Sequence, residues 1–408
     1  MAQLGLVLIA YPVLMATGWV LLALVFFLRR ERQERWLALP PALRPELGEP
    51  APVSVLIPCF NEASNLTETL QSALQLRWPD FEVIAINDGS RDDTGAQLEA
   101  WAAAHPRLRV VHLARNQGKA LALRAGALVA RHEWLVCIDG DARLHPDAVG
   151  WMVRHLQRNP RLAAVTGNPR IRNRTTLLGR LQVGEFSMII GLIKRAQSVL
   201  GGLFCVSGVI ATFRRSALHG VGFWNPDCLT EDIDITWRLQ RAGWQVTYEP
   251  HALVWILMPE TLAGLWKQRL RWAEGGLQVV LANLDLGAKP RQWHLVPLLL
   301  EPLLSLAWAY GIALGGVTAL VIGHPWALVP HGWGLVLLLI CVLQFSVSLW
   351  MDQPYDKGLA RIGFWMIWYP LAFWLITFCA ALLALPRVLL RRPGVRARWT
   401  SPDRGVRS

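Results

Sequence analysis

The sequence predicts an α/β domain inserted between apolar α-helices that are long enough to cross a membrane. Only 17% of the 408 residues are charged and 53% are hydrophobic, whereas soluble domains carry about 25% charged residues. From Pro50 onwards, short β-branched runs alternate with helical stretches, which is typical of a parallel sheet covered by helices on both faces. The chain is therefore neither a purely soluble protein nor an all-membrane transporter.

Four apolar runs account for the hydrophobic excess, and a bilayer needs roughly 20 apolar residues per crossing. The runs are Leu4–Leu28, Leu295–Gly323, Gly332–Met351 and Ile362–Pro386. The first run has neither a basic segment before it nor a clear small-residue cleavage site. We therefore expect a retained anchor rather than a cleaved signal peptide.

The region after the anchor predicts four strands, each followed by a helix. The strands are Val53–Ile57, Glu82–Ile86, Leu108–Leu113 and Trp134–Ile138, and the helices are Glu62–Leu76, Asp93–Ala103, Gly118–Arg131 and Pro146–Gln157. Right-handed crossovers place the carboxyl ends of such strands along one edge, where open α/β sheets bind ligands.

Beyond Arg161 the pattern is less regular. It predicts helices over Leu177–Leu200, Glu231–Arg241 and Glu260–Asn283, and a strand over Val206–Phe213. The last helix is apolar on one side and charged on the other, which is typical of a helix in the membrane interface. A helix packed in the core would give the same pattern.

Carboxylates follow the predicted strands. Asp88 comes after the second strand, and Asp139 and Asp141 come after the fourth. Two carboxylates one residue apart on a turn can face one cation, and Mg²⁺ or Mn²⁺ prefers oxygen ligands shared with substrate phosphates. A solvated, aspartate-rich turn is the alternative. No G-x-G-x-x-G follows the first strand, so the dinucleotide-binding fingerprint is absent. Carboxylates rather than a glycine loop face the ligand, and we therefore expect a nucleotide bound through a divalent metal, Mg²⁺ or Mn²⁺.

The net charge of +12 indicates anionic partners. The basic residues flank the apolar runs and form no single stripe, which favours anionic lipid and an anionic small substrate over nucleic acid.

The six cysteines show no metal-binding spacing and are typical of buried thiols in a reducing compartment. We expect His145, His251 and the cluster Arg170, Arg172 and Arg174 to be structural, with the arginines on a solvated face. Contact of these arginines with diphosphate or lipid is the alternative.

Six short motifs occur in an order that resembles the processive family 2 glycosyltransferases, the group of the cellulose, chitin and hyaluronan synthases. They are I-P-C-F-N-E at Ile57–Glu62, N-D-G-S at Asn87–Ser90, G-K-A at Gly118–Ala120, D-G-D at Asp139–Asp141, T-E-D at Thr230–Asp232 and Q-R-L-R-W at Gln268–Trp272. Four further segments resemble bacterial biofilm synthases of poly-β-1,6-N-acetylglucosamine: Leu181–Ser187, Val206–Ile210, Trp255–Thr261 and Arg396–Gly405.

The resemblance implies a GT-A domain, Rossmann-like and nucleotide-binding, between transmembrane segments. It divides the chain into an anchor (1–28), a cytoplasmic catalytic domain (29–258), amphipathic interface helices (259–294), a transmembrane channel region (295–387) and a basic tail (388–408). It also implies inverting, processive transfer of N-acetylglucosamine from UDP-GlcNAc to a growing β-1,6-linked glycan. The product would be exported across the bacterial inner membrane.

The resemblance further implies a role for each motif residue. Glu62 and Asp88 would hold the uridine, and Pro58 lies beside them in the first motif. Lys119 and Arg271 would meet the diphosphate, Asp139 the nucleotide, and Asp141 together with Asp139 the metal. Gln268 and Trp272 would serve the acceptor sugar at the membrane, and Asp232 would be the general base. For Glu62 and Lys119, a solvated charge at a helix start is the alternative; for Glu231 and Asp234 we expect helix-capping charges.

The resemblance also implies a small membrane partner and a response to cyclic diguanylate, because relatives in this family have both. No motif in this sequence indicates either. Three alternatives stay open. The chain could be another polysaccharide synthase of the hyaluronan, chitin or cellulose type. It could transfer one sugar to polyprenyl phosphate, although the Q-x-x-R-W motif favours a polymerase. It could be an inactive scaffold or channel subunit, against which the intact Asp141, Asp232 and Arg271 argue.

The number of crossings presents a conflict. Four crossings with a cytoplasmic domain place the arginine-rich tail outside, whereas the positive-inside rule places it inside. One run that fails to cross would remove the conflict. Leu295–Gly323, which Glu301-Pro302 interrupts, is the first candidate.

Overall fold

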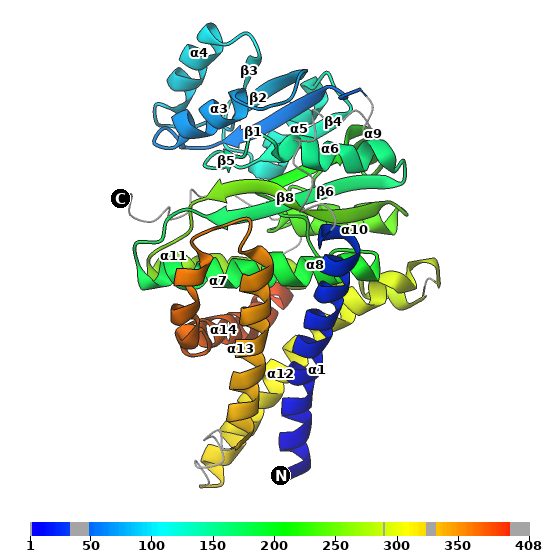
Figure 1. The fold of residues 1–408 in the computed structure, drawn as a ribbon, viewed down its shortest axis with the longest axis vertical. Coiled ribbons are helices and arrows are strands. Elements are labelled where there is room, and N and C mark those ends of the chain that lie inside the picture. The colour runs from blue at the N-terminus through cyan, green and yellow to red at the C-terminus, as the bar shows by residue number, and fades with distance from the viewer. Residues whose placement is uncertain (1, 33–48, 289, 324–331, 392–408) are drawn as a thin grey trace.

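The computed structural model describes residues 2–32, 49–288, 290–323 and 332–391. A mixed sheet lies at one end of the molecule, two long helical segments lie beneath it, and further apolar helices run away from these (Figure 1). The order of the eight strands in the sheet is β3-β2-β1-β4-β7-β6-β8-β5. Their bounds are β1 Val53–Cys59, β2 Phe81–Asn87, β3 Leu108–His112, β4 Trp134–Ile138, β5 Arg143–Leu144, β6 Leu162–Ile171, β7 Ile210–Arg214 and β8 Gln245–Ile256.

The four predicted strands are confirmed as β1 to β4, and they pair in parallel. Every residue of β1 and β2 is buried, as expected of strands covered on both faces. The expectation of a purely parallel sheet is wrong for the second half. Strand β7 runs antiparallel to β4 and β6, and β5 runs antiparallel to β8. Strands β6 and β8 were not predicted.

The predicted helices of the domain are found close to their predicted positions, and one further helix, α9, was not predicted. Their bounds are α3 Leu66–Leu74, α4 Thr94–Ala104, α5 Lys119–Val129, α6 Ala148–Arg158, α9 Arg215–Gly220 and α10 Glu231–Arg241. Helix α3 begins four residues later than predicted, because Glu62 lies in the turn after β1, where its carbonyl accepts hydrogen bonds from the backbone N–H groups of Asn65 and Leu66.

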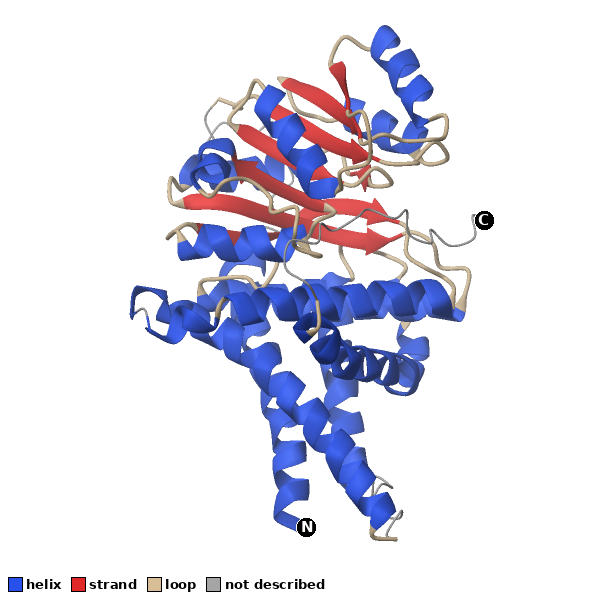
Figure 2. Ribbon diagram, turned by 180° about the vertical axis from the view of Figure 1, so that it is seen from behind, coloured by secondary structure: helices blue, strands red, loops and turns tan. Residues whose placement is uncertain are grey.

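Two long helical segments lie beneath the sheet (Figures 1 and 2). The first is continuous over the predicted Leu177–Leu200, as α7 (Leu177–Phe186), a π-helical stretch (Ser187–Ile193) and α8 (Lys194–Leu200). The second is α11 (Leu262–Ala282), which carries the Gln268–Trp272 motif. Leu265 and Val280 of α11 are buried, whereas Leu262 and Lys267 are exposed.

Four helices are long and apolar enough to cross a membrane. They are α1 (Ala2–Phe26, extended by a π-helical turn at Phe27–Glu31), α12 (Val296–Val321), α13 (Gly332–Asp352) and α14 (Tyr369–Leu389). Helices α1, α12 and α13 run away from the sheet, whereas α14 lies across them beside α11 (Figures 1 and 2). Helix α12 continues without a break through Pro302.

Both ends of α14 are held on α11. Near its start, the Phe373 ring lies 5.8 Å from the guanidinium carbon of Arg269. Near its end, Arg387 Nη1 lies 3.1 Å from Glu274 Oε1. The predicted basic tail begins at the end of this helix, and its residues 392–408 lie outside the described part of the chain.

Buried ion pairs join the domain to these helices. Arg195 of α8 contacts Glu31 at the end of α1 and Asp352 at the end of α13, both at 2.7 Å. Arg170 of β6 also lies 2.7 Å from Asp352 and is 1% exposed. The expectation of a solvated arginine face is therefore wrong for Arg170, because Asp352, far along the chain, supplies a buried partner.

Candidate active site

Lys119 lies where three segments meet at the carboxyl edge of the sheet. As the first residue of α5, it places its Nζ 2.5 Å from Asp139 Oδ1 and 3.3 Å from Glu231 Oε1. It also donates a hydrogen bond to the carbonyl of Gly208 at 3.0 Å. Burial lowers the pKa of Lys119, but the carboxylates of Asp139 and Glu231 raise it by more, so the amine stays charged.

Asp232 lies beside this cluster in the first turn of α10. Its Oδ2 accepts a hydrogen bond from the Gly208 N–H at 3.1 Å, and its Oδ1 accepts one from the Ile233 N–H at 2.9 Å. Burial and the neighbouring Glu231 raise the pKa of Asp232, and Lys119 offsets part of this rise. A fixed carboxylate with a raised pKa suits a general base.

A side chain at Gly208 would press against the charged groups around it. A Cβ at this position would lie 2.9 Å from Asp232 Oδ2 and 3.2 Å from Lys119 Nζ. The backbone of Gly208 thus approaches both charged groups closely and hydrogen-bonds to both. Because Gly208 has no side chain, its backbone can contact Lys119 and the Asp232 carboxylate at the same time.

Asp88 fixes the start of α5. Its two carboxylate oxygens accept hydrogen bonds from the backbone N–H groups of Gln117 and Gly118, each at 2.8 Å. Burial raises the pKa of Asp88 to about 6, although these two hydrogen bonds oppose the rise. Asp88 therefore positions Lys119, while each oxygen keeps a further lone pair for a ligand.

Pro58, Glu62 and the Asp139–Asp141 turn come together at the ends of β1 and β4. A Cβ on Gly140 would lie 3.0 Å from the Pro58 carbonyl oxygen and 3.1 Å from Glu62 Cγ. Glu62 and Asp141 are both buried. No group of three or more His, Cys, Asp or Glu residues in the described parts of the chain is arranged to hold a metal. Asp139 and Asp141 therefore form at most a partial donor set.

The three motif residues of α11, Gln268, Arg271 and Trp272, have different neighbours. Arg271 Nη1 lies 3.5 Å from the Leu229 carbonyl, and its charge lowers the pKa of Asp232. Gln268 Nε2 lies 3.9 Å from Met258 Sδ, and its Oε1 is buried without a hydrogen-bond partner among the described residues. The Trp272 ring lies 4.4 Å from the guanidinium carbon of Arg269.

Sequence reasoning missed two members of the cluster. Glu231, expected to be a helix-capping charge, instead contacts Lys119. Gly208 contacts Lys119 and Asp232 through its backbone. Both lie inside segments that the sequence singles out, Thr230–Asp232 and Val206–Ile210, but their partners are distant in the chain.

The sequence pattern of the family described as glycosyltransferase like family 2 matches residues 50–275, more than half of the chain. The chain is a family 2 glycosyltransferase. It is thus an enzyme that transfers sugars, which sets aside the inactive scaffold, and it binds a nucleotide sugar and an acceptor glycan.

Two relatives match this glycosyltransferase over nearly its full length. The protein named poly-β-1,6-N-acetyl-D-glucosamine synthase from Staphylococcus epidermidis is 37% identical, with 98% of each chain covered. The protein of the same name from Staphylococcus aureus is 36% identical over the same shares. These similarities confirm the predicted family resemblance.

A solved structure supports the fold. The glycosyltransferase is similar to a mannosyltransferase from Pyrobaculum calidifontis, solved in complex with GDP-Man and Mn²⁺. The TM-score is 0.58 at 21% identity, and the match covers 94% of this chain and 99% of the other. The predicted GT-A fold is thereby confirmed.

Proposed function

We propose that this glycosyltransferase polymerises N-acetylglucosamine from UDP-GlcNAc into a β-1,6-linked glycan for a biofilm matrix. The observation that carries the proposal is the alignment with two synthases of this polymer over 98% of each chain. The alignment with these synthases thus covers both the catalytic region and the apolar helices. A transferase that serves polyprenyl phosphate would share the catalytic region without a need to conduct a polymer.

The geometry around Asp232 supports inverting transfer. The acceptor hydroxyl oxygen attacks the anomeric carbon of the donor while the bond from that carbon to the UDP oxygen breaks. Asp232 takes the acceptor hydroxyl proton as the new bond forms. Lys119 and Arg271 approach Asp232 from α5 and α11, and both can neutralise charge on the departing diphosphate.

The remaining motif residues have roles in binding. Glu62, Asp88 and the Pro58 backbone would hold the uridine at the ends of β1 and β2. Gln268 has an unused amide oxygen, and it lies one helical turn from Trp272 on α11. We assign this face to the acceptor sugar, which stacks on the indole ring.

Asp139 and Asp141 fit a divalent metal, Mg²⁺ or Mn²⁺. Mg²⁺ is usually bound by one or two carboxylates together with substrate phosphates, rather than by an all-protein cage. Two carboxylates without a third acidic ligand match that requirement. A metal held there supplies positive charge to the diphosphate. Asp139, which already contacts Lys119, would be shared between the metal and the amine.

We further propose that the enzyme lies in the bacterial inner membrane, with its catalytic domain in the cytoplasm, and crosses with α1, α12 and α13 only. Both ends of α14 contact α11, so a crossing by α14 would require one end to leave. Helix α14 exposes Trp374, Leu375 and Leu383 and suits the interface layer. The basic tail then lies on the cytoplasmic side, which removes the conflict with the positive-inside rule.

The membrane partner, the response to cyclic diguanylate and the five regional boundaries remain predictions from resemblance.

The proposed function is tested with membranes that contain the full-length enzyme and a panel of radiolabelled UDP-sugars. We expect UDP-GlcNAc to give a polymer that organic solvent does not extract and whose linkage analysis shows 1→6 bonds. Incorporation of glucose or glucuronate in its place would overturn the assignment, and a solvent-extractable product would favour polyprenyl phosphate as acceptor.

A further inference from the structure

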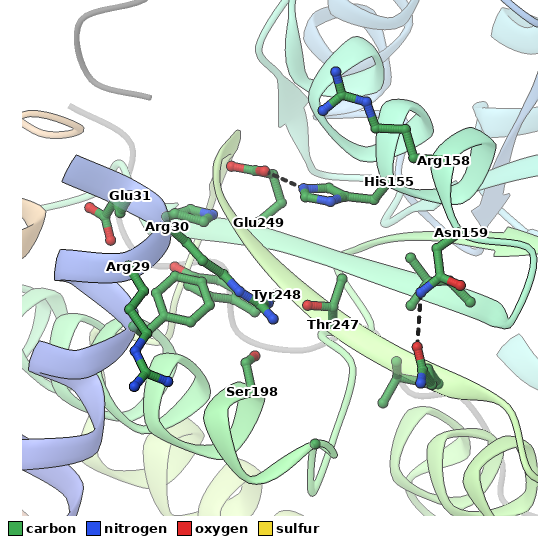
Figure 3. Close-up of a pocket in the computed structure, with 16 residues that line it drawn as sticks. Arg29, Arg30, Glu31, His155, Arg158, Asn159, Ser198, Thr247, Tyr248 and Glu249 are labelled. Carbon is green, nitrogen blue, oxygen red and sulfur yellow. Dashed lines mark hydrogen bonds and ion pairs between the residues drawn. The ribbon is translucent and has the colours of Figure 1, made fainter. Parts of the chain in front are cut away.

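A cavity of about 490 Å³ lies at the cytoplasmic end of α1, apart from the Lys119–Asp232 cluster. Its walls come from the end of α1, the end of α6, α8 and β8 (Figure 3). The volume lies within the range of about 300–1,000 Å³ that is usual for small-ligand sites. None of the proposed catalytic or nucleotide-binding residues lines it.

The cavity carries unneutralised positive charge. Arg29 and Arg30 line it from the end of α1, and Arg158 lines it from the last residue of α6. In Figure 3 the Arg29 and Arg158 side chains lie on opposite sides of the cavity. None of the three forms an ion pair with an acid among the described residues. The site therefore favours an anion.

The two acids in the wall are already engaged. Glu31 contacts Arg195 at 2.7 Å and accepts a hydrogen bond from the Tyr355 hydroxyl at 2.8 Å. Glu249 lies 2.9 Å from Arg154 and 2.6 Å from His155. Burial would raise the pKa of Glu249, but its hydrogen bonds to His155 and His251 and the nearby charges lower it well below its usual range. Because Glu31 and Glu249 pair with other residues of the wall, they do not neutralise Arg29, Arg30 or Arg158.

A buried hydroxyl without a partner faces the cavity. Ser198 of α8 is 8% exposed, and its Oγ has no hydrogen-bond partner in the described parts of the chain. Figure 3 shows this hydroxyl pointing into the space in front of Thr247 and Tyr248. Because a buried hydroxyl without a hydrogen bond is unfavourable, a ligand oxygen at this place would satisfy it.

The position of the cavity selects the kind of anion. Arg29 and Arg30 directly follow an apolar helix, and Leu28 beside them is 53% exposed. Basic residues at the end of such a helix lie at the level of lipid headgroups. We propose that this cavity binds the phosphate group of an anionic phospholipid, with Ser198 donating a hydrogen bond to the phosphate and the charges of Arg29, Arg30 and Arg158 at the rim attracting it.

A short segment of chain joins the cavity to the Lys119–Asp232 cluster. Helix α8 ends at Leu200, and the chain then leads to Gly208, whose N–H binds Asp232. Between them, the backbone N–H of Leu203 donates to Gln240 of α10 at 2.8 Å. A lipid that holds α8 against α1 therefore supports the segment that positions Asp232.

The test measures binding directly, so that it does not depend on the proposed function. The full-length protein in a neutral detergent is titrated with dihexanoyl phosphatidylglycerol, and bound lipid is counted by native mass spectrometry. Dihexanoyl phosphatidylcholine, glycerol phosphate and inorganic phosphate are the three comparison probes. We expect phosphatidylglycerol to bind at least tenfold more tightly than each of them.

Matched variants locate the site. The double variant Arg30→Gln with Arg158→Gln should weaken phosphatidylglycerol binding at least tenfold, and Ser198→Leu should do so by filling the cavity. Arg361→Gln removes an exposed arginine that does not line the cavity and should bind as the unchanged protein does. Thermal unfolding checks that each variant is folded.

Three results would overturn the proposal. Unchanged phosphatidylglycerol binding by both the double variant and Ser198→Leu would show that the lipid binds elsewhere. Equal binding of phosphatidylcholine would show that charge does not select the ligand. Equal binding of glycerol phosphate or inorganic phosphate would make the cavity a site for a soluble anion.

Discussion

Lys119 Nζ lies 2.5 Å from Asp139 Oδ1, so the start of α5 and the end of β4 present opposite charges to each other at the edge of the sheet. The same amine lies 3.3 Å from Glu231 Oε1 on α10. One lysine thus neutralises carboxylates from two distant segments in a place where we expect a diphosphate. Without it, two negative groups would face the negatively charged ligand.

The first prediction follows from this contact. Replacement of Lys119→Gln should weaken UDP binding roughly tenfold to a hundredfold, since hydrogen bonds to charged groups contribute about 1.5–3 kcal/mol. Isothermal titration of the purified enzyme with UDP measures the effect. Lys267→Gln, which changes an exposed lysine of α11, is the matched control. UDP affinity that is equal in the two variants would contradict the role of Lys119.

The second prediction concerns the base. Asp232→Asn should reduce polymer synthesis by at least ~100-fold, the lower range of general-base contributions, while UDP binding stays within about threefold. Asp234→Asn is the control, because Asp234 lies in the same helical turn and is paired with Arg238 at 2.7 Å. Robust polymer synthesis by Asp232→Asn would remove Asp232 from the mechanism.

The residues around this base show how far the sequence could predict the structure. Strands β1 to β4 are short apolar runs followed by polar turns, and local pattern alone predicts them. Strand β6 contains Gly167 and Pro169, and β8 contains Pro250; both patterns read locally as strand breaks. Their pairing over Leu162–Ile171 is a long-range property. The antiparallel direction of β7 is equally invisible to local periodicity.

The same distinction applies to the candidate site. Asp139, Lys119 and Asp232 are identified by motif, because each motif is contiguous. The sequence does not reveal that Glu231 pairs with Lys119, since an acid in a first helical turn ordinarily serves the helix dipole. The contact depends on how α10 lies against α5, which only the three-dimensional structure establishes.

The third prediction tests the close approach at Gly208. Gly208→Ala should lower the turnover number at least tenfold, because the new Cβ would lie 2.9 Å from Asp232 Oδ2 and 3.2 Å from Lys119 Nζ. Gly220→Ala, where a Cβ meets nothing within 4 Å, should retain activity. Initial rates of polymer formation and thermal unfolding are measured for both. A fully active, stable Gly208→Ala enzyme would show that the site tolerates a shift of the lysine or the base.

The fourth prediction concerns pH. The base must be deprotonated, so the turnover number falls as the pH decreases through the pKa of Asp232, which burial and Glu231 raise. Glu231→Gln removes one negative neighbour and should lower that pKa, moving the acidic limb of the pH–rate profile to lower pH. Glu99→Gln, on an exposed helix surface, should leave the profile in place. A shift toward higher pH after Glu231→Gln would contradict the assignment of the limb to Asp232.

The last prediction concerns the membrane topology. Because Phe373 and Arg387 both contact α11, α14 should start and end on the side of the catalytic domain. Single cysteines introduced by His324→Cys, between α12 and α13, and by Ser408→Cys, at the C-terminus, are placed in a background without the six native cysteines. Labelling of sealed, oriented vesicles with a membrane-impermeant maleimide distinguishes the two sides.

Position 408 should react together with Arg91→Cys, an exposed residue of the domain, and position 324 should react from the opposite side. Reaction of positions 324 and 408 from the same side would mean that α14 crosses the bilayer and that its contacts with Arg269 and Glu274 break in the membrane.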